Sequence, residues 1–112
     1  MPTINRSALL VRPREPFLRW AAGIDESAPR HAESLRDRTR VYLVPPDPSG
    51  RAEAAPLKRY FAEVFEAELE AWCPERSLWP VSLDLATFRE WFEVQTTSVV
   101  EDLCDDELEH DE

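Results

Sequence analysis

The glutamates Glu63, Glu66 and Glu70 follow one another at intervals of three and four residues. On a helix this spacing places three carboxylates along one edge. Carboxylates arranged in this way can bind a hard cation, or they can raise the pKa of one carboxyl group so that it serves in acid/base catalysis. A metal-dependent or acid/base enzyme that uses them is therefore one hypothesis, although no histidine follows on the same helix to complete a carboxylate-bridged metal site. The simpler interpretation is that they face water, opposite an apolar stripe, and serve as binding residues for a partner.

The soft metal ligands of the chain are Cys73, Cys104, His31 and His110. Zinc sites usually show ligand pairs at short spacing, such as C-x-x-C, and the sequence has no such pair. Two incidental thiols are the better interpretation, and we expect neither a metal nor a cofactor. A nucleophile–base pair is not expected either, because neither histidine lies where the fold would hold it rigidly. The two glycines of the chain also make no phosphate-binding loop.

The most unusual local sequence is Trp-Cys-Pro-Glu-Arg-Ser-Leu-Trp-Pro, over residues 72–80. Two tryptophans that flank a proline-bounded loop are typical of an aromatic cleft for a peptide or a ligand ring. The alternative is that both indoles fill the base of the core. Trp72 continues the apolar stripe of the preceding helix, which favours a place in the core. Trp79 lies outside any periodic face and is a candidate binding residue.

Charge is divided unevenly along the chain. Residues 1–60 hold eleven Lys/Arg against seven Asp/Glu, a net of +4, whereas residues 61–112 hold two arginines against sixteen Asp/Glu, a net of −14. The total of −10 disfavours attraction to nucleic acid or to an anionic membrane surface. An acidic half complements a basic protein surface and speeds association with it. We therefore predict a small acidic binding or interaction protein of the accessory, immunity or inhibitor type, without catalytic activity, whose partner is a protein with a basic surface.

Four arginines, at positions 30, 36, 38 and 40, lie close together in the first half with acids between them. We expect them to pair with the protein's own glutamates or with those of a second subunit, so a homo-oligomer is compatible with the sequence.

The N-terminal residues contain no apolar signal-peptide core, and no run approaches the roughly 18 apolar residues that span a bilayer. Two cysteines without an export signal are typical of a reducing compartment. The expected location is the cytoplasm.

The length predicts one domain. Strand-like segments lie at 7–11, 40–44 and 93–100, and helix patterns at 16–23, at 57–72 and after Asp84. Residues 25–39 predict a short helix or a structured loop, and residues 45–56 an exposed, proline-rich loop. This order predicts an α+β, two-layer domain over residues 1–103, with about three strands in one sheet and amphipathic helices packed on one face. An acidic tail, expected to be flexible, follows at 104–112, and strand order and direction stay open.

The strongest element is the helix at 57–72. Its large apolar residues recur at spacings of four and three: Leu57, Phe61, Phe65, Leu69 and Trp72, with Tyr60 and Val64 widening the stripe. We expect this face to form the core.

Aromatic and proline residues recur in five short motifs: Pro16-Phe17-x-x-Trp20, Val41-Tyr42-Leu43-x-Pro45, Glu68-Leu69-Glu70-x-Trp72, Leu78-Trp79-Pro80 and Trp91-Phe92. In these motifs the chain resembles a family of small acidic bacterial proteins of uncharacterised function, over residues 5–103. The resemblance implies a shared fold and a bacterial source, and it carries no activity with it.

Overall fold

The structure, a computed structural model, describes residues 3–46 and 54–109 of the chain. Within these ranges it contains four α-helices, two short 3-10 turns and five strands. The α+β prediction is thereby confirmed. In chain order the elements are β1 (Thr3–Ile4), β2 (Ser7–Pro13), α1 (Glu15–Ala22), α2 (Ala28–Ala32), the 3-10 turn Glu33–Leu35, β3 (Arg40–Val44), α3 (Ala54–Trp72), the 3-10 turn Arg76–Leu78, α4 (Leu85–Trp91), β4 (Phe92–Thr97) and β5 (Val100–Glu101).

The main sheet has three antiparallel strands in the order β3-β2-β4. In its register Leu9 of β2 lies between Tyr42 of β3 and Thr96 of β4. Since side chains alternate between the two faces of a sheet, these three residues share a face. Leu9 is fully buried, so this is the face that turns toward the core.

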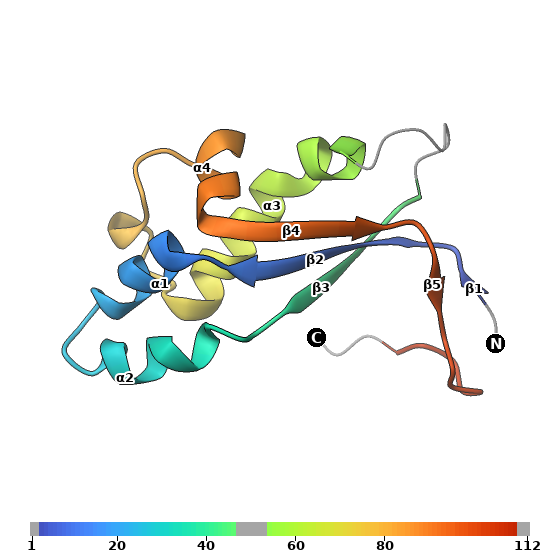
Figure 1. Ribbon diagram of the computed structural model, residues 1–112, viewed down its shortest axis with the longest axis horizontal. Coiled ribbons are helices and arrows are strands. Elements are labelled where there is room, and N and C mark those ends of the chain that lie inside the picture. The colour runs from blue at the N-terminus through green and yellow to red at the C-terminus, as the bar shows by residue number, and fades with distance from the viewer. Residues whose placement is uncertain (1–2, 47–53, 110–112) are drawn as a thin grey trace.

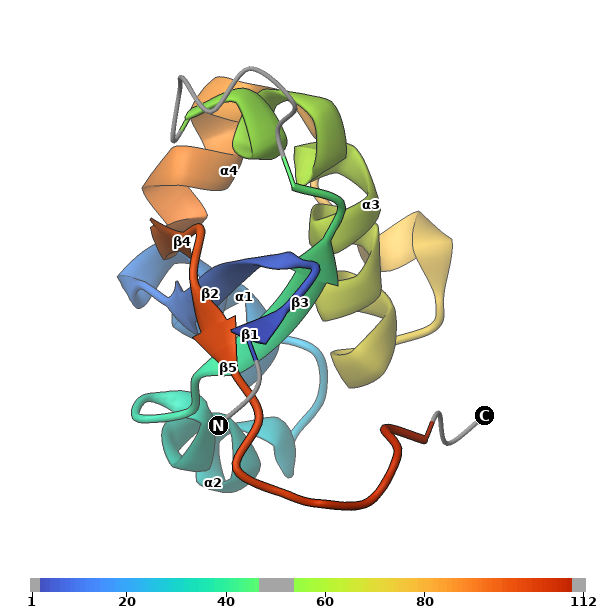
Figure 2. The ribbon, with the colours of Figure 1, turned by 90° about the vertical axis from the view of Figure 1, so that its right-hand side faces the viewer.

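The helices cover this sheet unevenly. In Figures 1 and 2, α3 and α4 lie along one face, whereas α1 and α2 gather at the end of the sheet where β2 ends and β3 begins. A small antiparallel ribbon of β1 and β5 lies at the opposite end. The sequence did not predict this ribbon, because strands of two residues carry no periodic signal.

The core stripe expected on the long helix is confirmed. Phe65 and Leu69 are fully buried, Leu57 and Val64 nearly so, and the other large members of the stripe are half-buried. The Phe65 ring packs against α4 and β4, with its centroid 5.4 Å from that of Phe88 and 5.8 Å from that of Phe92. Large aromatic side chains therefore fill most of the core with few residues.

Local sequence sets most of the helix ends. Asp84 caps α4, where its carboxylate accepts a hydrogen bond of 2.8 Å from the Thr87 backbone N–H. Gly23 is the C-cap of α1 and donates its N–H to the carbonyls of Arg19 and Trp20. The helix α3 begins earlier than expected, at Ala54, since Pro56 is tolerated in a first turn.

One further expectation needs correction, and two others fall partly outside the described residues. The strand expected at 93–100 is broken into β4 and β5, because the Thr97 hydroxyl contacts the backbone N–H and carbonyl of Val99 and forms a local turn. The middle of the predicted loop, residues 47–53, and the last three residues of the tail lie outside the described ranges. From Asp102 to Glu109 the chain has neither helix nor strand, and its leucines are exposed.

Candidate functional site

The three glutamates singled out by their spacing lie on the side of α3 that faces away from the core. Glu63 and Glu70 are exposed and Glu66 is half-exposed. Glu66 forms an ion pair with Arg76 of the following turn, at 3.6 Å between Oε1 and Nη1. The carboxylates therefore line a solvated helix edge, as their position opposite the apolar stripe predicts.

The acid/base alternative requires these glutamates to converge with a histidine in a concave site. Glu63 lines a groove on one side of α3, whereas Glu66 is bound to Arg76. His31 lies on α2, is exposed, and lines neither of the two cavities described below. No observation in the described part of the chain therefore favours catalysis by this set.

The groove beside Glu63 lies between β3 and α3. Its volume is about 250 Å³, enough for one large side chain of a partner. Apolar atoms and two tyrosine rings make most of its wall, and Glu63 is its only acidic residue among those described. The lining residues are Tyr42, Leu43, Val44, Pro45, Tyr60, Glu63, Val64 and Ala67.

Trp79 is half-buried and is held by two contacts. Its indole N–H donates a 2.8 Å hydrogen bond to the carbonyl of Cys73, at the end of α3. The Arg76 guanidinium lies over its ring, 4.7 Å from the centroid. These contacts fold the turn back onto the helix, and Arg76 joins Trp79 to Glu66, so that two of the predicted binding residues share one arginine.

The other tryptophans of this region join separate elements. Trp72 donates its indole N–H to the carbonyl of Ala21 in α1, at 3.0 Å. Trp20 of α1 donates to the carbonyl of Leu78, at 2.8 Å. Trp72 thus packs against the core as its place in the stripe predicts, and the indole pair brings α1 against the end of α3.

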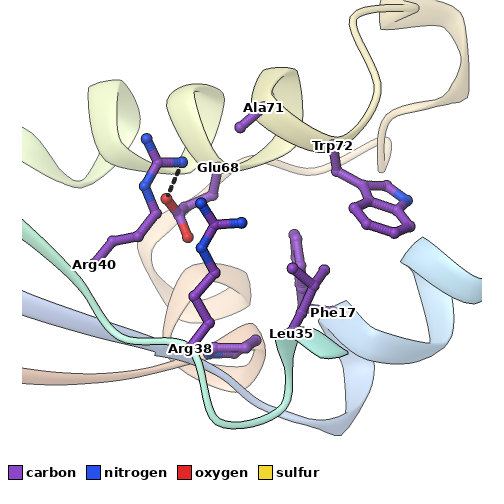
Figure 3. Close-up of a pocket in the computed structure, with 8 residues that line it drawn as sticks. Phe17, Leu35, Arg38, Arg40, Glu68, Ala71 and Trp72 are labelled. Atoms are coloured by element: carbon purple, nitrogen blue, oxygen red, sulfur yellow. Dashed lines mark ion pairs between the residues drawn. The ribbon is translucent and has the colours of Figure 1, made fainter. Parts of the chain in front are cut away.

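A buried ionic cluster links β3 to α3 (Figure 3). The sequence predicts that Arg40 pairs with a glutamate of the same chain, but it did not identify Glu68 as that partner. Glu68 is 7% exposed, and its Oε2 lies 2.9 Å from Nη1 of Arg40. The same oxygen accepts a hydrogen bond from the Tyr42 hydroxyl. Burial, together with this bond to a carboxylate, raises the pKa of Tyr42 well above its usual value.

The cavity next to this cluster is small. It measures about 40 Å³, which leaves room for water molecules but not for a substrate. Figure 3 shows Arg38 and Arg40 extending from the β3 side toward Glu68, with Phe17, Leu35 and Trp72 at the other end of the cavity. The Arg40 guanidinium and the Tyr42 hydroxyl both donate to Glu68, so the cluster fastens the helix to the sheet.

The position of Glu68 could have been found from the sequence. It follows Val64 by four residues and Phe65 by three, so it lies within the apolar stripe rather than opposite it. A charged residue at such a position requires a partner, and Arg40 at the start of the clearest strand was available.

The two cysteines do not form a disulfide with each other. Cys73 is buried and Cys104 exposed, and both are free thiols, as expected. Among residues 3–46 and 54–109, no group of three or more His, Cys, Asp or Glu side chains is placed to hold a metal ion. His110 lies outside those ranges.

Comparisons with protein-family models, with curated proteins and with solved structures found no match for this chain. Across the described residues, none of the helices has the length and apolar character needed to cross a membrane.

Proposed function

We propose that the protein is a small binding protein without catalytic activity, which engages a basic surface of a protein partner in the cytoplasm. The observation that carries this proposal is the excess of exposed acids without an ion pair in the described part of the second half. Most ion-paired arginines of the first half are bound by acids of the same half. Arg36 contacts Glu15 and Glu33, and Arg12 lies 3.9 Å from Asp37.

In the second half, sixteen acids far outnumber the two arginines that could pair with them locally. Among the described residues, ion pairs involve only two of them, Glu66 and Glu68. Eleven others are exposed and have no ion pair within that part of the chain: Glu63, Glu70, Glu75, Asp84, Glu90, Glu93, Glu101, Asp105, Asp106, Glu107 and Glu109. Exposed carboxylates that are not neutralised produce a negative potential, which steers a basic partner into contact.

Two further features support the binding proposal. The groove beside Glu63 offers apolar and tyrosine surface next to a carboxylate, a combination that suits the long apolar stem and cationic head of lysine or arginine. Both cysteines are free thiols, which agrees with a reducing compartment. An accessory, immunity or inhibitor role is consistent with this surface.

The test is the rate of association with the partner isolated from the native host by affinity capture. In stopped-flow measurements we expect association to slow by about tenfold or more as salt rises from 0.01 M to 0.15 M, because the Debye length falls from about 30 Å to about 8 Å. The combined replacement of Glu63, Glu66 and Glu70 by Gln should slow it at low salt while leaving the fold intact, since exposed charges contribute little to stability.

A matched pair of single variants separates a local surface from net charge. Glu70→Gln and Glu26→Gln each remove one exposed carboxylate, the first from α3 and the second from the loop between α1 and α2. We expect Glu70→Gln to slow association more. Equal rates for both variants would place the contact away from α3. An association rate that changes neither with salt nor with the triple substitution would refute the electrostatic proposal.

A further inference from the structure

The small cavity beside Glu68 has two unlike ends. At one end, the guanidinium groups of Arg38 and Arg40 extend from the β3 side toward Glu68, as Figure 3 shows. At the other end the wall is apolar and aromatic, and it includes the indole of Trp72. The residues that line the cavity carry two positive charges and one negative charge, so its wall keeps a local charge of +1.

Glu68 already has its partners. Its Oε2 lies 2.9 Å from Nη1 of Arg40 and also accepts a hydrogen bond from the Tyr42 hydroxyl. A buried carboxylate requires such partners, and Glu68 is only 7% exposed. Because one guanidinium balances its single charge, Arg38 is not needed for that purpose.

The side chain of Arg38 has no ion pair and no hydrogen bond within the described residues, whereas Arg36 and Arg40, two positions away on either side, both have carboxylate partners. Burial and the bond to Glu68 raise the pKa of Tyr42, and the charges of Arg40 and Arg38 oppose that rise, so Arg38 is near enough to act on the site. Two guanidinium groups that converge in this way favour an anion between them.

We propose that Arg38 and Arg40 together bind a carboxylate group of a ligand at the open side of this cavity. The planar guanidinium matches the two oxygens of a carboxylate, and hydrogen bonds between these charged groups are among the strong ones in proteins. Arg38 and Ala71 are exposed, so this side of the cavity is open to solvent.

The volume of the cavity defines the ligand further. About 40 Å³ corresponds to about three water molecules, so a carboxylate and the carbon next to it fit, while the rest of a larger ligand stays outside. The tetrahedral phosphate group is larger and fits less well. The carboxylate can come from a small free acid or from the C-terminus of a peptide. We expect a Kd of about 1 to 10 mM for the carboxylate alone, because both arginines are partly exposed.

The experiment is a titration of the ¹⁵N-labelled full chain with sodium acetate, at an ionic strength kept constant with sodium chloride. The expected result is a saturable shift of two NMR signals, the Trp72 indole N–H and the Arg38 Nε–H, with a Kd in the millimolar range. The Trp79 indole does not line the cavity and should not shift. Absence of both shifts up to about 50 mM acetate would overturn the proposal.

A matched pair of variants separates this site from net charge. Arg38→Gln and Arg30→Gln each remove one exposed arginine that has no ion pair among the described residues. Arg38→Gln should raise the Kd for acetate about fivefold or more, and Arg30→Gln should change it less than about twofold. Equal losses would mean that acetate responds to net charge alone. Arg38→Lys keeps the charge without the planar fork, so full affinity in this variant would refute the paired guanidinium site.

Three other probes identify the ligand. Tighter binding of N-acetyl-diglycine than of acetate assigns the site to a peptide C-terminus, whereas equal or weaker binding assigns it to a small free acid. The C-terminal amide of the same peptide should not bind, and inorganic phosphate should bind more weakly than acetate; the opposite result for either would overturn the carboxylate assignment. The exposed acids of the proposed partner surface do not line this cavity, so acetate binding and association with a basic partner can fail independently.

Discussion

Phe65 is the side chain whose removal most directly tests the account of the core. Its ring is fully buried and packs against three other rings, with centroids 5.4 Å from Phe88, 5.8 Å from Phe92 and 5.9 Å from Trp91. Truncation of a buried Phe to Ala costs about 3 to 5 kcal/mol, and each lost aromatic pair adds about 0.5 to 1.5 kcal/mol beyond burial in the cases measured. We therefore expect Phe65→Ala to lie toward the upper end of the 3 to 5 kcal/mol range.

The matched control is Phe61→Ala, one helical turn earlier on the same stripe. Phe61 is half-buried and has one described ring partner, Phe88, at 6.3 Å. Only part of its surface leaves water on folding, so we expect a loss of about 1 to 2 kcal/mol. Both values come from urea titrations followed by far-UV circular dichroism. The reasoning fails if Phe65→Ala costs less than about 1 kcal/mol, or if the two variants lose the same amount.

Three further predictions concern ionisation and thiol chemistry. Tyr42→Phe should cost about 1 to 2 kcal/mol at neutral pH by removing the bond to Glu68. Because the folded pKa of Tyr42 is raised, wild-type stability should also fall as pH rises above about 10, and the Phe variant should lose less there in thermal melts. Asp84→Ala should destabilise the protein by removing the N-cap of α4. Because hydrogen bonds from Thr87 lower the pKa of Asp84, the difference in stability between wild type and this variant should shrink as pH falls below about 4. Thiol titration should find Cys104 reactive in the native protein and Cys73 only after unfolding.

The elements that carry strong local patterns could be predicted from the sequence. The four-residue spacing of large apolar side chains predicts α3, and the β-branched and aromatic run Arg40–Val44 predicts β3 with its observed ends. Asp84 predicts the start of α4, because an N-cap acts on the backbone three residues away. These signals are local in the chain, so they can be recognised without knowledge of the rest of the fold.

The candidate site was predictable in part. The sequence placed Glu63, Glu66 and Glu70 together on an exposed helix edge, which the structure shows. It did not place Arg76 between Glu66 and Trp79, since that contact depends on how the turn after α3 folds back. The burial of Glu68 was not predicted either, although the spacing of Glu68 from Val64 and Phe65 places it in the apolar stripe.

The strand order and directions were decided only by the tertiary structure. Each strand taken alone is compatible with parallel or antiparallel pairing, because the period-2 pattern of side chains is the same in both. Which strands become neighbours depends on contacts between residues far apart in the chain, such as Leu9 with Tyr42 and Thr96. Composition and local spacing thus determined that this chain has an acidic second half and an aromatic core helix. Long-range pairing alone decided that β2 lies at the centre of the main sheet and that Arg40 and Tyr42 meet Glu68, because these depend on which segments the collapsed chain brings together.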